Sequence, residues 1–390
     1  MRGIMRGYDT LAEFRQWGLM TMLLKRTVLI TGVGSPGAPG IIRSLRLAHN
    51  WDIRLIGVDA NRRAAGSFLL DHFYVVPEAQ DPKFIPTMLE ICKNESVHVI
   101  LPMVTAELIP FAKHASAFQE LGCVVSVSSE SVLETAIHKN KLFEVLAGQG
   151  FSIPQFKLVN TSKALMNAIE ELGYPHTPVC FKPAQGDGSR GFHVLDAKQN
   201  RIENFFLAKP DATLVSLTEL SEVLHHQSAL PELLVMEYLP GSEYSVDLLV
   251  NHGEVLVTVP RRREKIVGGI TTQGTIVEEH DVLNYASHVA KVMKLHGNIG
   301  IQVRRSQTGI VKLLEVNPRL QGTVVHCTGA GVNMPLLAVK LALGMPVEQS
   351  ELQIRWGTRL YRYWNEVFYH EEGAKGGAAY TLDMLKEPNL

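Results

Sequence analysis

The stretch Asn298–Gly322, NIGIQVRRSQTGIVKLLEVNPRLQG, predicts two β-strands joined by a tight turn near Gln307–Gly309. Side chains alternate between the faces of a strand, so Glu315 and Asn317 project from the same face of the second strand. The turn brings Gln302 of the first strand within about two residues of Glu315 across the ladder. We therefore expect three oxygen-bearing side chains in one small patch of a sheet.

Such a patch has the chemistry of a magnesium–triphosphate site. Magnesium takes carboxylate and amide oxygens and leaves its remaining positions to water and substrate phosphates. Arg319 follows the second strand at once, and its guanidinium is suited to a terminal phosphoryl group. From this stretch alone, a hairpin with a few polar residues on its solvent face remains the alternative.

The composition is that of an ordinary globular protein, with 390 residues of which 46% are hydrophobic and 20% charged. A chain of this length holds about two or three domains. Because 38 Lys and Arg balance 39 Asp and Glu, the charge gives no reason to expect nucleic acid or an anionic membrane as a partner. The few cysteines have no metal-type spacing and fit a reducing compartment, and the apolar run at 17–24 is too short for a membrane span. We expect a cytoplasmic protein.

The glycine-rich segment GVGSPGAPG at 32–40 follows a short apolar strand at 27–31 and precedes a helix and a second strand that ends at Asp59. This pattern predicts a βαβ unit. The glycines fit the dinucleotide fingerprint G-x-G-x-x-G only loosely, so either a nucleotide-binding turn or a turn that serves the fold alone is open. A further strand at 97–101 leads to Glu107, which is either a substrate contact or a cap of the next helix.

The strand PVCFKP at 178–183 carries a single charge, Lys182, and runs into a loop rich in glycine. Its backbone donors suit phosphate, although a plain hairpin turn is the alternative. The candidate phosphate-loop residues are Gly186, Gly188, Ser189, Arg190 and Gly191.

From residue 233 the pattern is strongly β, with the segment EYLPGSE at 237–243 between two strands. A basic cluster follows at Arg261, Arg262, Arg263 and Lys265. In a chain without net charge this cluster indicates an anionic ligand, while a solvated charge run is the alternative.

In their order and spacing these segments resemble the ATP-grasp superfamily, and within it the synthetase units of carbamoyl-phosphate synthase and related carboxylate–amine ligases. The resemblance implies that Lys141 and Lys182 bind nucleotide phosphate and that the loop 186–191 closes over it. It implies that Glu237, Tyr238 and Leu239 form the hinge that reads adenine, with Glu243 on the ribose. It further implies that Gln302, Glu315 and Asn317 bind magnesium, and that Arg319 contacts phosphate.

The implied activity is an ADP-forming ligase that joins a carboxylate to an amine through an acyl phosphate. ATP and two Mg²⁺ ions, or Mn²⁺ in their place, are the expected cofactors, and small molecules are the expected substrates. The expected catalytic cations are Arg319, Lys182, Arg261 and Arg263, the last two holding the substrate carboxylate or acyl phosphate. The resemblance also suggests a homodimer through the first domain.

The expected fold class is α/β: a Rossmann-like pre-ATP-grasp domain followed by the two α+β subdomains of an ATP-grasp fold. The expected units are an N-terminal extension at 1–25, the first domain at 26–135, a central subdomain with the phosphate loop at 136–235, a metal-binding subdomain at 236–346 and a tail at 347–390. Two other functions stay open: an NAD(P)-dependent oxidoreductase that uses the glycine-rich turn and Asp59, and a nucleotide-binding protein without catalysis.

Overall fold

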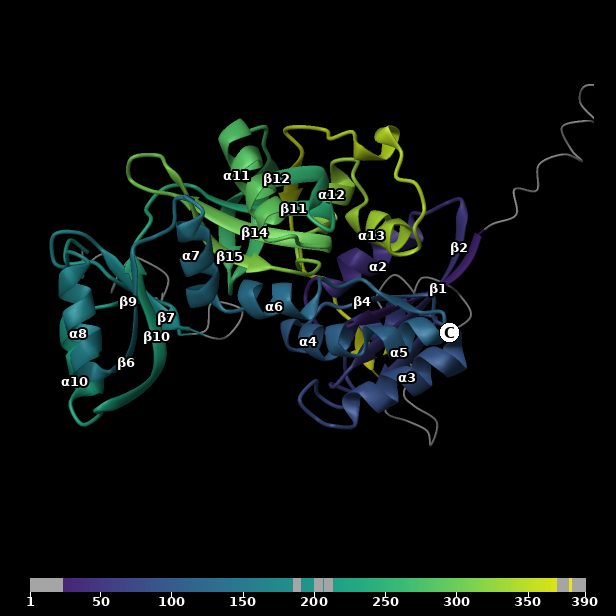
Figure 1. The fold of residues 1–390 in the computed structure, drawn as a ribbon, viewed down its shortest axis with the longest axis horizontal. Helices are drawn as coiled ribbons and strands as arrows, with labels where there is room; N and C mark the ends of the chain where they lie inside the picture. Colours follow the sequence, from purple (N-terminus) through teal and green to yellow (C-terminus); the bar gives the residue numbers. More distant parts are fainter. Residues whose placement is uncertain (1–23, 185–190, 200–205, 207–212, 370–378, 381–390) are drawn as a thin grey trace, which may run out of the picture.

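The computed structural model describes residues 24–184, 191–199, 206, 213–369 and 379–380. Three larger β-sheets with their covering helices form the lobes of this part of the chain (Figure 1), and a two-stranded sheet follows near its end. Within these residues, no helix combines the length and the apolar character that crossing a bilayer requires.

The first sheet is parallel, with strand order β3-β2-β1-β4-β5. Its strands are β1 (Leu24–Thr31), β2 (Trp51–Asp59), β3 (His72–Val75), β4 (Val99–Leu101) and β5 (Val124–Val125). Its helices are α2 (Ala38–Arg46), α3 (Phe84–Glu95), α4 (Thr105–Lys113) and α5 (Ala115–Glu120), with a 3-10 turn, η1, at Ala65–Leu69. The predicted βαβ opening is β1, α2 and β2.

Strand β1 is buried on both faces, as is usual when helices cover both sides of a parallel sheet. Val28 and Ile30 pack with α2 in one hydrophobic core, whereas Leu29 between them packs with α3 and α5 in another. This alternation follows from the two-residue period of a strand. Because β1 is packed on both faces, it holds the turn that follows it in place between the two hydrophobic cores.

The second sheet has the order β6-β10-β7-β8-β9 and forms the lobe that carries α8 and α10 (Figure 1). Its strands are β6 (Phe156–Thr161), β7 (Val179–Pro183), β8 (His193–Leu195), β9 (Leu214–Val215) and β10 (Ala229–Glu237). Its helices are α8 (Ser162–Glu171) and α10 (Leu217–Leu224), while α6 (Glu130–Ala136) and α7 (Lys139–Gly148) lead into it from the first sheet.

The third sheet has the order β15-β14-β11-β12-β13-β16. Its strands are β11 (Glu243–Asn251), β12 (Glu254–Val267), β13 (Ile270–Ile276), β14 (Gly297–Arg305), β15 (Val311–Asn317) and β16 (Arg359–Tyr361). Helices α11 (His280–Val292), α12 (Val325–Gly329) and α13 (Met334–Ala342) and the 3-10 turn η2 (Gln349–Leu352) accompany it, and a short pair, β17 (Phe368–Tyr369) and β18 (Ala379–Tyr380), follows. The predicted hairpin is β14 and β15, and Gln302 lies opposite Glu315 in its register.

The first and third sheets share one hydrophobic core, in which α2 meets α12 and α13. The backbones come into close contact where the turn after β1 meets the loop after β15. A Cβ atom on Gly37 would lie 2.3 Å from the Cα atom of Gly322, so a larger residue would force the two loops apart. This contact brings the glycine-rich segment next to the stretch that carries Arg319.

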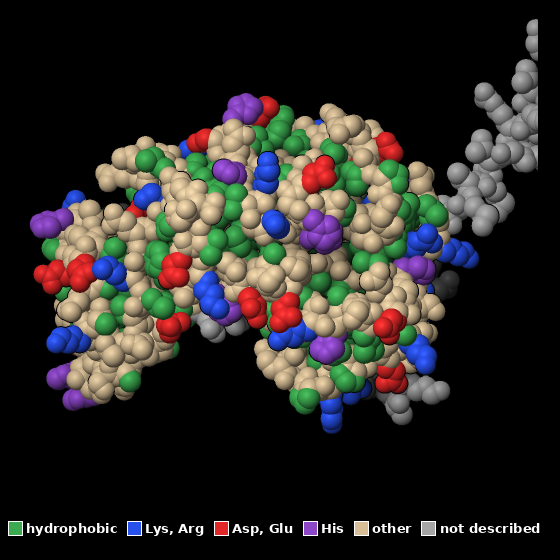
Figure 2. Space-filling view, in the orientation of Figure 1, with side chains coloured by type: hydrophobic (Ala, Val, Ile, Leu, Met, Phe, Trp, Pro, Cys, Tyr) green, Lys and Arg blue, Asp and Glu red, His purple; other side chains and the backbone are tan. Residues whose placement is uncertain are grey.

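The face of the molecule in Figure 2 shows Lys and Arg side chains interspersed with Asp and Glu. A notch separates the lobe of α8 and α10 from the lobe of the first sheet in this view. The mixed charge on this face agrees with the balanced composition and offers no single-sign surface for a polyanion.

Candidate nucleotide and metal site

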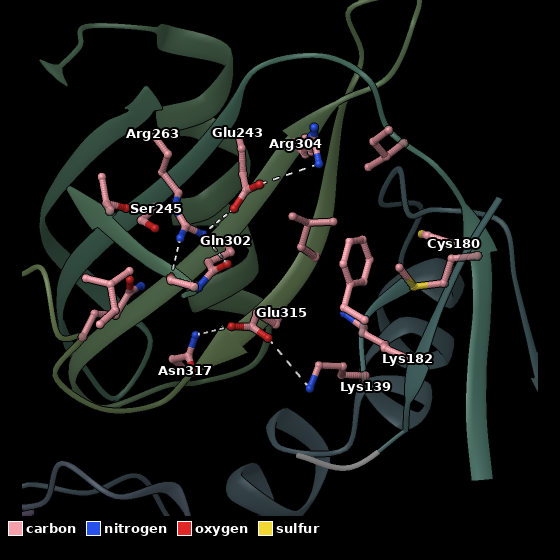
Figure 3. A pocket seen from close by; sticks show the side chains of 18 of the residues that line it. Lys139, Cys180, Lys182, Glu243, Ser245, Arg263, Gln302, Arg304, Glu315 and Asn317 are labelled. Carbon is pink, nitrogen blue, oxygen red and sulfur yellow. Dashed lines mark hydrogen bonds and ion pairs between the residues drawn. The ribbon is translucent and has the colours of Figure 1, made fainter. Parts of the chain in front are cut away.

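A pocket lies between the second and third sheets, with its walls drawn from strands that are far apart in the sequence (Figure 3). The second sheet contributes Lys182 on β7 and Glu237 on β10, and the third contributes side chains from β11 to β15. Because alternate residues of a strand share a face, polar side chains of the third sheet line the pocket while their neighbours fill the core beneath. The cleft between two sheets is thus polar on one wall.

At the base of the pocket lie the three residues predicted as metal ligands. Asn317 Nδ2 donates to Glu315 Oε1 at 2.8 Å, and Gln302 Oε1 accepts from Arg263 Nη1 at 3.2 Å. Lys139 Nζ lies 3.8 Å from Glu315 Oε2. Burial acts to raise the pKa of Glu315, but Lys139 and Lys182 outweigh it and hold the pKa below its usual value. Glu315 is therefore ready to bind a cation at neutral pH.

The oxygens of one carboxylate and two amides suit a hard ion such as Mg²⁺, which relies on water and phosphate for the rest of its shell. Among the described residues no group of three His, Cys, Asp or Glu side chains is placed to hold a metal.

Two lysines approach Glu315 from the opposite wall, and one of them is not the residue predicted from the sequence. Lys182 lines the pocket, and burial lowers its pKa while Glu315 opposes that effect. Lys139 also lines the pocket and is 7% exposed, whereas Lys141 is exposed on α7 and absent from the lining. A helix turns by about 100° per residue, so residues two apart point in different directions. The structure thus places Lys139, and not Lys141, at the pocket, and the nucleotide-binding role expected of Lys141 stays a prediction.

The far end of the pocket holds the predicted hinge. Glu237 Oε1 pairs with Lys312 Nζ at 2.6 Å, and Glu237 Oε2 accepts the Gln155 backbone N–H at 2.9 Å. The carboxylate is thus engaged within the protein, and its segment is fixed in place. Tyr238 and Leu239 line the same wall, and the Arg304 guanidinium lies 5.0 Å from the centre of the Tyr238 ring. This is a rigid, partly aromatic rim.

Glu243, predicted to meet the ribose, lies between two cations. Arg263 Nη1 donates to Glu243 Oε1, and Arg304 Nη1 lies 3.7 Å from Glu243 Oε2 (Figure 3). The same Arg263 donates to Thr271 Oγ1 at 2.9 Å and to Gly269 O at 2.7 Å. Arg263 therefore connects the ribose candidate Glu243 to the metal candidate Gln302.

Arg319 lines the pocket and reaches the first sheet's lobe. Its Nε donates to Thr105 Oγ1 at the start of α4, at 2.9 Å, and its Nη2 lies 3.5 Å from Asn317 Oδ1. Arg261 behaves differently: it is 1% exposed, pairs with Asp247 and does not line the pocket. Lys265 is exposed further along β12. The Arg261 guanidinium therefore lies behind the pocket wall, and its predicted contact with substrate stays a prediction that this placement does not favour.

This architecture is similar to that of known proteins. Residues 229–361 match a family model described as ATP-grasp in the biosynthetic pathway with Ter operon, and residues 28–126 match the PylC-like N-terminal domain. The solved ADP complex of purK, N5-carboxyaminoimidazole ribonucleotide synthetase, superposes with a TM-score of 0.62 at 15% identity, covering 85% of this chain and 80% of that one. This is an ATP-grasp fold. The predicted fold class and the resemblance to the superfamily are confirmed.

Two further similarities accompany this fold. The arginine-specific carbamoyl phosphate synthase large chain of Halalkalibacterium halodurans is 22% identical over 329 residues, which are 81% of this chain and 28% of that protein. The L-amino acid ligase from Bacillus licheniformis superposes with a TM-score of 0.57 at 16% identity, covering 84% of this chain and 76% of that one. The chain thus spans little more than a quarter of the length of the first of these relatives.

In the predicted phosphate loop of the ATP-grasp unit, the structure describes only Gly191, which has a φ of +66° and packs against Pro183. Gly186, Gly188, Ser189 and Arg190 lie outside the described residues. Their role stays a prediction.

The lining residues that sequence reasoning missed include Lys139, Ser245, Arg304 and Gln321. Ser245 and Arg304 each lie two positions from a predicted residue, Glu243 and Gln302, on the same face of the same strand. Strand alternation could have found them.

Asp59 forms hydrogen bonds within the glycine-rich turn region of the first sheet. Asp59 Oδ2 accepts the Gly34 N–H at 2.7 Å, and Oδ1 accepts the Asn61 N–H at 2.8 Å. This use of Asp59 favours a turn that serves the fold over a dinucleotide site. Glu107 lies buried in the first turn of α4 and accepts a hydrogen bond from Thr31 Oγ1, and burial raises its pKa to about 7.

Proposed function

We propose that the protein is an ADP-forming ligase that joins a small-molecule carboxylate to an amine through an acyl phosphate. The observation that carries the proposal is Glu315, a carboxylate at the base of the pocket with Asn317 at 2.8 Å and Lys139 at 3.8 Å, and with Gln302 opposite it in the ladder. An anionic metal ligand beside two lysines is what a nucleotide triphosphate requires.

In this proposal ATP lies along the pocket, with adenine at Tyr238 and Leu239 and the phosphates at Lys139 and Lys182. Gln302, Glu315 and Asn317 would hold Mg²⁺, which supplies neutralisation of phosphate charge. Two ions, or Mn²⁺ in their place, remain predictions. Glu243 would bind the ribose once its carboxylate gives up its contact with Arg263 or with Arg304.

The reaction then needs little covalent chemistry from the protein. A substrate carboxylate oxygen attacks the γ-phosphorus and the bond to the β-phosphate oxygen breaks, which yields an acyl phosphate and ADP. An amine attacks the acyl carbon, loses a proton and expels inorganic phosphate. Lys182, Arg319 and Arg263 stabilise the charge that spreads over the transferring group.

The substrate end is placed at Arg319 and the loop that follows it. This loop touches the glycine-rich turn at Gly37, and Arg319 bonds Thr105 of the first sheet's lobe. We infer that the first domain closes the substrate end, as a pre-ATP-grasp domain would. A homodimer through this domain, a cytoplasmic location and the domain boundaries remain predictions.

The test is phosphate release by the purified chain with ATP, Mg²⁺ and pooled carboxylates and amines. We expect ADP and phosphate, formed only when a carboxylate is present and with loss of activity in Glu315→Gln. AMP as the product, or full activity in Glu315→Gln, would refute the proposal. Binding of ATP without substrate-stimulated turnover would favour the non-catalytic alternative, and thermal stabilisation by NAD(P)H but not by ATP would favour the oxidoreductase.

A further inference from the structure

The end of β14 carries two consecutive arginines that lie on opposite faces of the third sheet. Arg304 lines the pocket, whereas its neighbour Arg305 does not. Successive side chains of a strand alternate between its faces, so Arg305 points to the side that α11 covers (Figure 1). Both arginines contact the segment 237–243, which forms the rim of the pocket at the predicted base and ribose end.

The backbone of Arg305 is bonded to this segment in both directions. The Gly241 N–H donates to Arg305 O at 3.0 Å, and the Arg305 N–H donates to Ser242 O at 3.0 Å. A Cβ atom on Gly241 would lie 2.7 Å from the Cβ atom of Arg305, so only glycine allows this close approach. The position of Arg305 therefore determines the position of the turn that follows Tyr238 and Leu239.

The Arg305 side chain is held by the first turn of α11. Its Nη1 and Nη2 donate to the two carboxylate oxygens of Asp281 at 2.6 and 3.0 Å, and Nη2 also donates to Glu279 Oε2 at 2.5 Å. The Tyr244 hydroxyl accepts from Arg305 Nε at 3.3 Å and donates to the same Glu279 oxygen at 2.7 Å. Because the guanidinium engages both carboxylates, its orientation is fixed.

This ion cluster is charged at neutral pH but is open to water in part. The hydrogen bond from Arg305 holds the pKa of Asp281 below its usual value. The side chains of Arg305 and Glu279 are 21% and 27% exposed. Partly exposed ion pairs add little to folding stability, whereas a bidentate pair in a network fixes geometry. We therefore expect the cluster to determine where the end of β14 lies more than how stable the sheet is.

Arg304 holds the same segment from the pocket side. Its Nε donates to Gly241 O at 3.1 Å, and its Nη2 donates to the Tyr238 hydroxyl at 3.3 Å. Its Nη1 lies 3.7 Å from Glu243 Oε2 (Figure 3). The turn is thus held between two arginines. A nucleotide that binds here meets a segment that is already ordered, which lowers the entropic cost of binding.

We propose that Arg305, held by Glu279 and Asp281, is a positioning residue that fixes the segment 238–243 for the base and ribose of ATP. This inference rests on the proposed placement of ATP in the pocket and adds a residue that would not touch the nucleotide itself. Loss of Arg305 then weakens binding of the nucleoside part of ATP, while binding of the triphosphate part at Lys139 and Lys182 is unchanged.

The test is calorimetry with two ligands in excess Mg²⁺. One is ATP and the other is inorganic tripolyphosphate, which carries the phosphates but neither base nor ribose. In Arg305→Met we expect the Kd for ATP to rise about tenfold, while the Kd for tripolyphosphate changes less than about twofold. Arg305→Lys keeps the charge but loses the fork, and should give a smaller rise in the Kd for ATP.

Two further variants separate positioning from general support of the fold. Lys340→Met is the matched control, since Lys340 of α13 forms an ion pair of similar exposure with Glu351 and lies outside the pocket lining; it should leave both Kd values unchanged. Glu279→Gln acts from α11 and should raise the Kd for ATP in the same sense as Arg305→Met. If Glu279 acts through Arg305, adding Glu279→Gln to Arg305→Met raises that Kd no further.

An unchanged Kd for ATP in Arg305→Met would overturn the inference, as would an equal rise in the Kd values for ATP and tripolyphosphate. Should Arg305→Met fail to fold, Arg305→Lys and Glu279→Gln decide by the same comparison. Should tripolyphosphate not bind to the unaltered protein, the Kd for ATP in Arg305→Met relative to Lys340→Met decides. If the unaltered protein does not bind ATP, the proposed function fails and the inference falls with it. ATP binding with an unchanged Kd in Arg305→Met refutes the inference alone.

Discussion

Replacing Lys139 with Met tests whether this pocket-lining lysine binds nucleotide phosphate. Lys139 Nζ and Glu315 Oε2 are 3.8 Å apart, which corresponds to about 4 kcal/mol at an effective dielectric constant of about 20. The Glu315 side chain is 26% exposed, so solvent screening reduces this to about 2 kcal/mol. Without the Lys139 charge, a phosphate group at a similar distance would lose a comparable interaction energy, which corresponds to about a 30-fold weaker Kd for ATP.

In the assay, ATP is titrated into each variant in the presence of excess Mg²⁺, and binding is measured by calorimetry. Lys141→Met is the matched control on the same helix. We expect the control to bind within about twofold of the unaltered protein, since the Lys141 side chain is exposed and outside the pocket lining. Loss of Lys139 also removes the larger of the two lysine effects on the pKa of Glu315, so that pKa rises and ATP–Mg²⁺ binding fails at a higher pH. Equal losses in both variants, or a larger loss in Lys141→Met, would refute the reasoning.

Three further predictions concern the framework. Because burial raises the pKa of Glu107 to about 7, the protonated carboxyl stabilises the fold fully below the unfolded pKa, and this contribution is lost as pH rises through about 7. In urea unfolding at several pH values, Glu107→Gln should therefore lack about 3 kcal/mol of the pH dependence of the unfolding free energy. The same pH dependence in both proteins would contradict this. Gly37→Ala should cost about 1–3 kcal/mol of unfolding free energy by overpacking, whereas Gly148→Ala, which meets no atom within 4 Å, should cost nothing; equal melting temperatures would contradict this. Arg261→Met should cost about 3–5 kcal/mol by leaving Asp247 unpaired, and adding Asp247→Leu should recover part of that in the same unfolding experiment; a larger combined loss would argue against a buried ion pair.

The hairpin was predictable because its signals are local. A turn sequence, the strand period and the chemistry of Glu315 and Asn317 all lie within one short stretch, and the register of Gln302 opposite Glu315 follows from the turn. Lys182 was predictable for a similar reason, since it is the only charge in an apolar strand. These features needed no knowledge of distant contacts.

The placement of Lys141 and Arg261 outside the pocket lining depends on distant contacts. Lys139 and Lys141 have the same chemistry, and only the packing of α7 against the sheet determines which of them points into the pocket. Arg261 and Arg263 share a face of β12 and each pairs with a carboxylate on β11, yet Arg261 is buried behind the pocket wall while Arg263 lines the pocket. Strand alternation predicts the face of a side chain but not what covers it.

The loop from Arg319 to Thr323 is where these parts of the molecule meet. Arg319 bonds Thr105 of the first sheet's lobe, Gly322 touches Gly37 of the glycine-rich turn, and Gln321 accepts from Arg261. A change of substrate by evolution could therefore act through the first domain without altering Glu315 or the lysines. For the same reason, ATP affinity and carboxylate affinity should respond to different sets of substitutions in this chain.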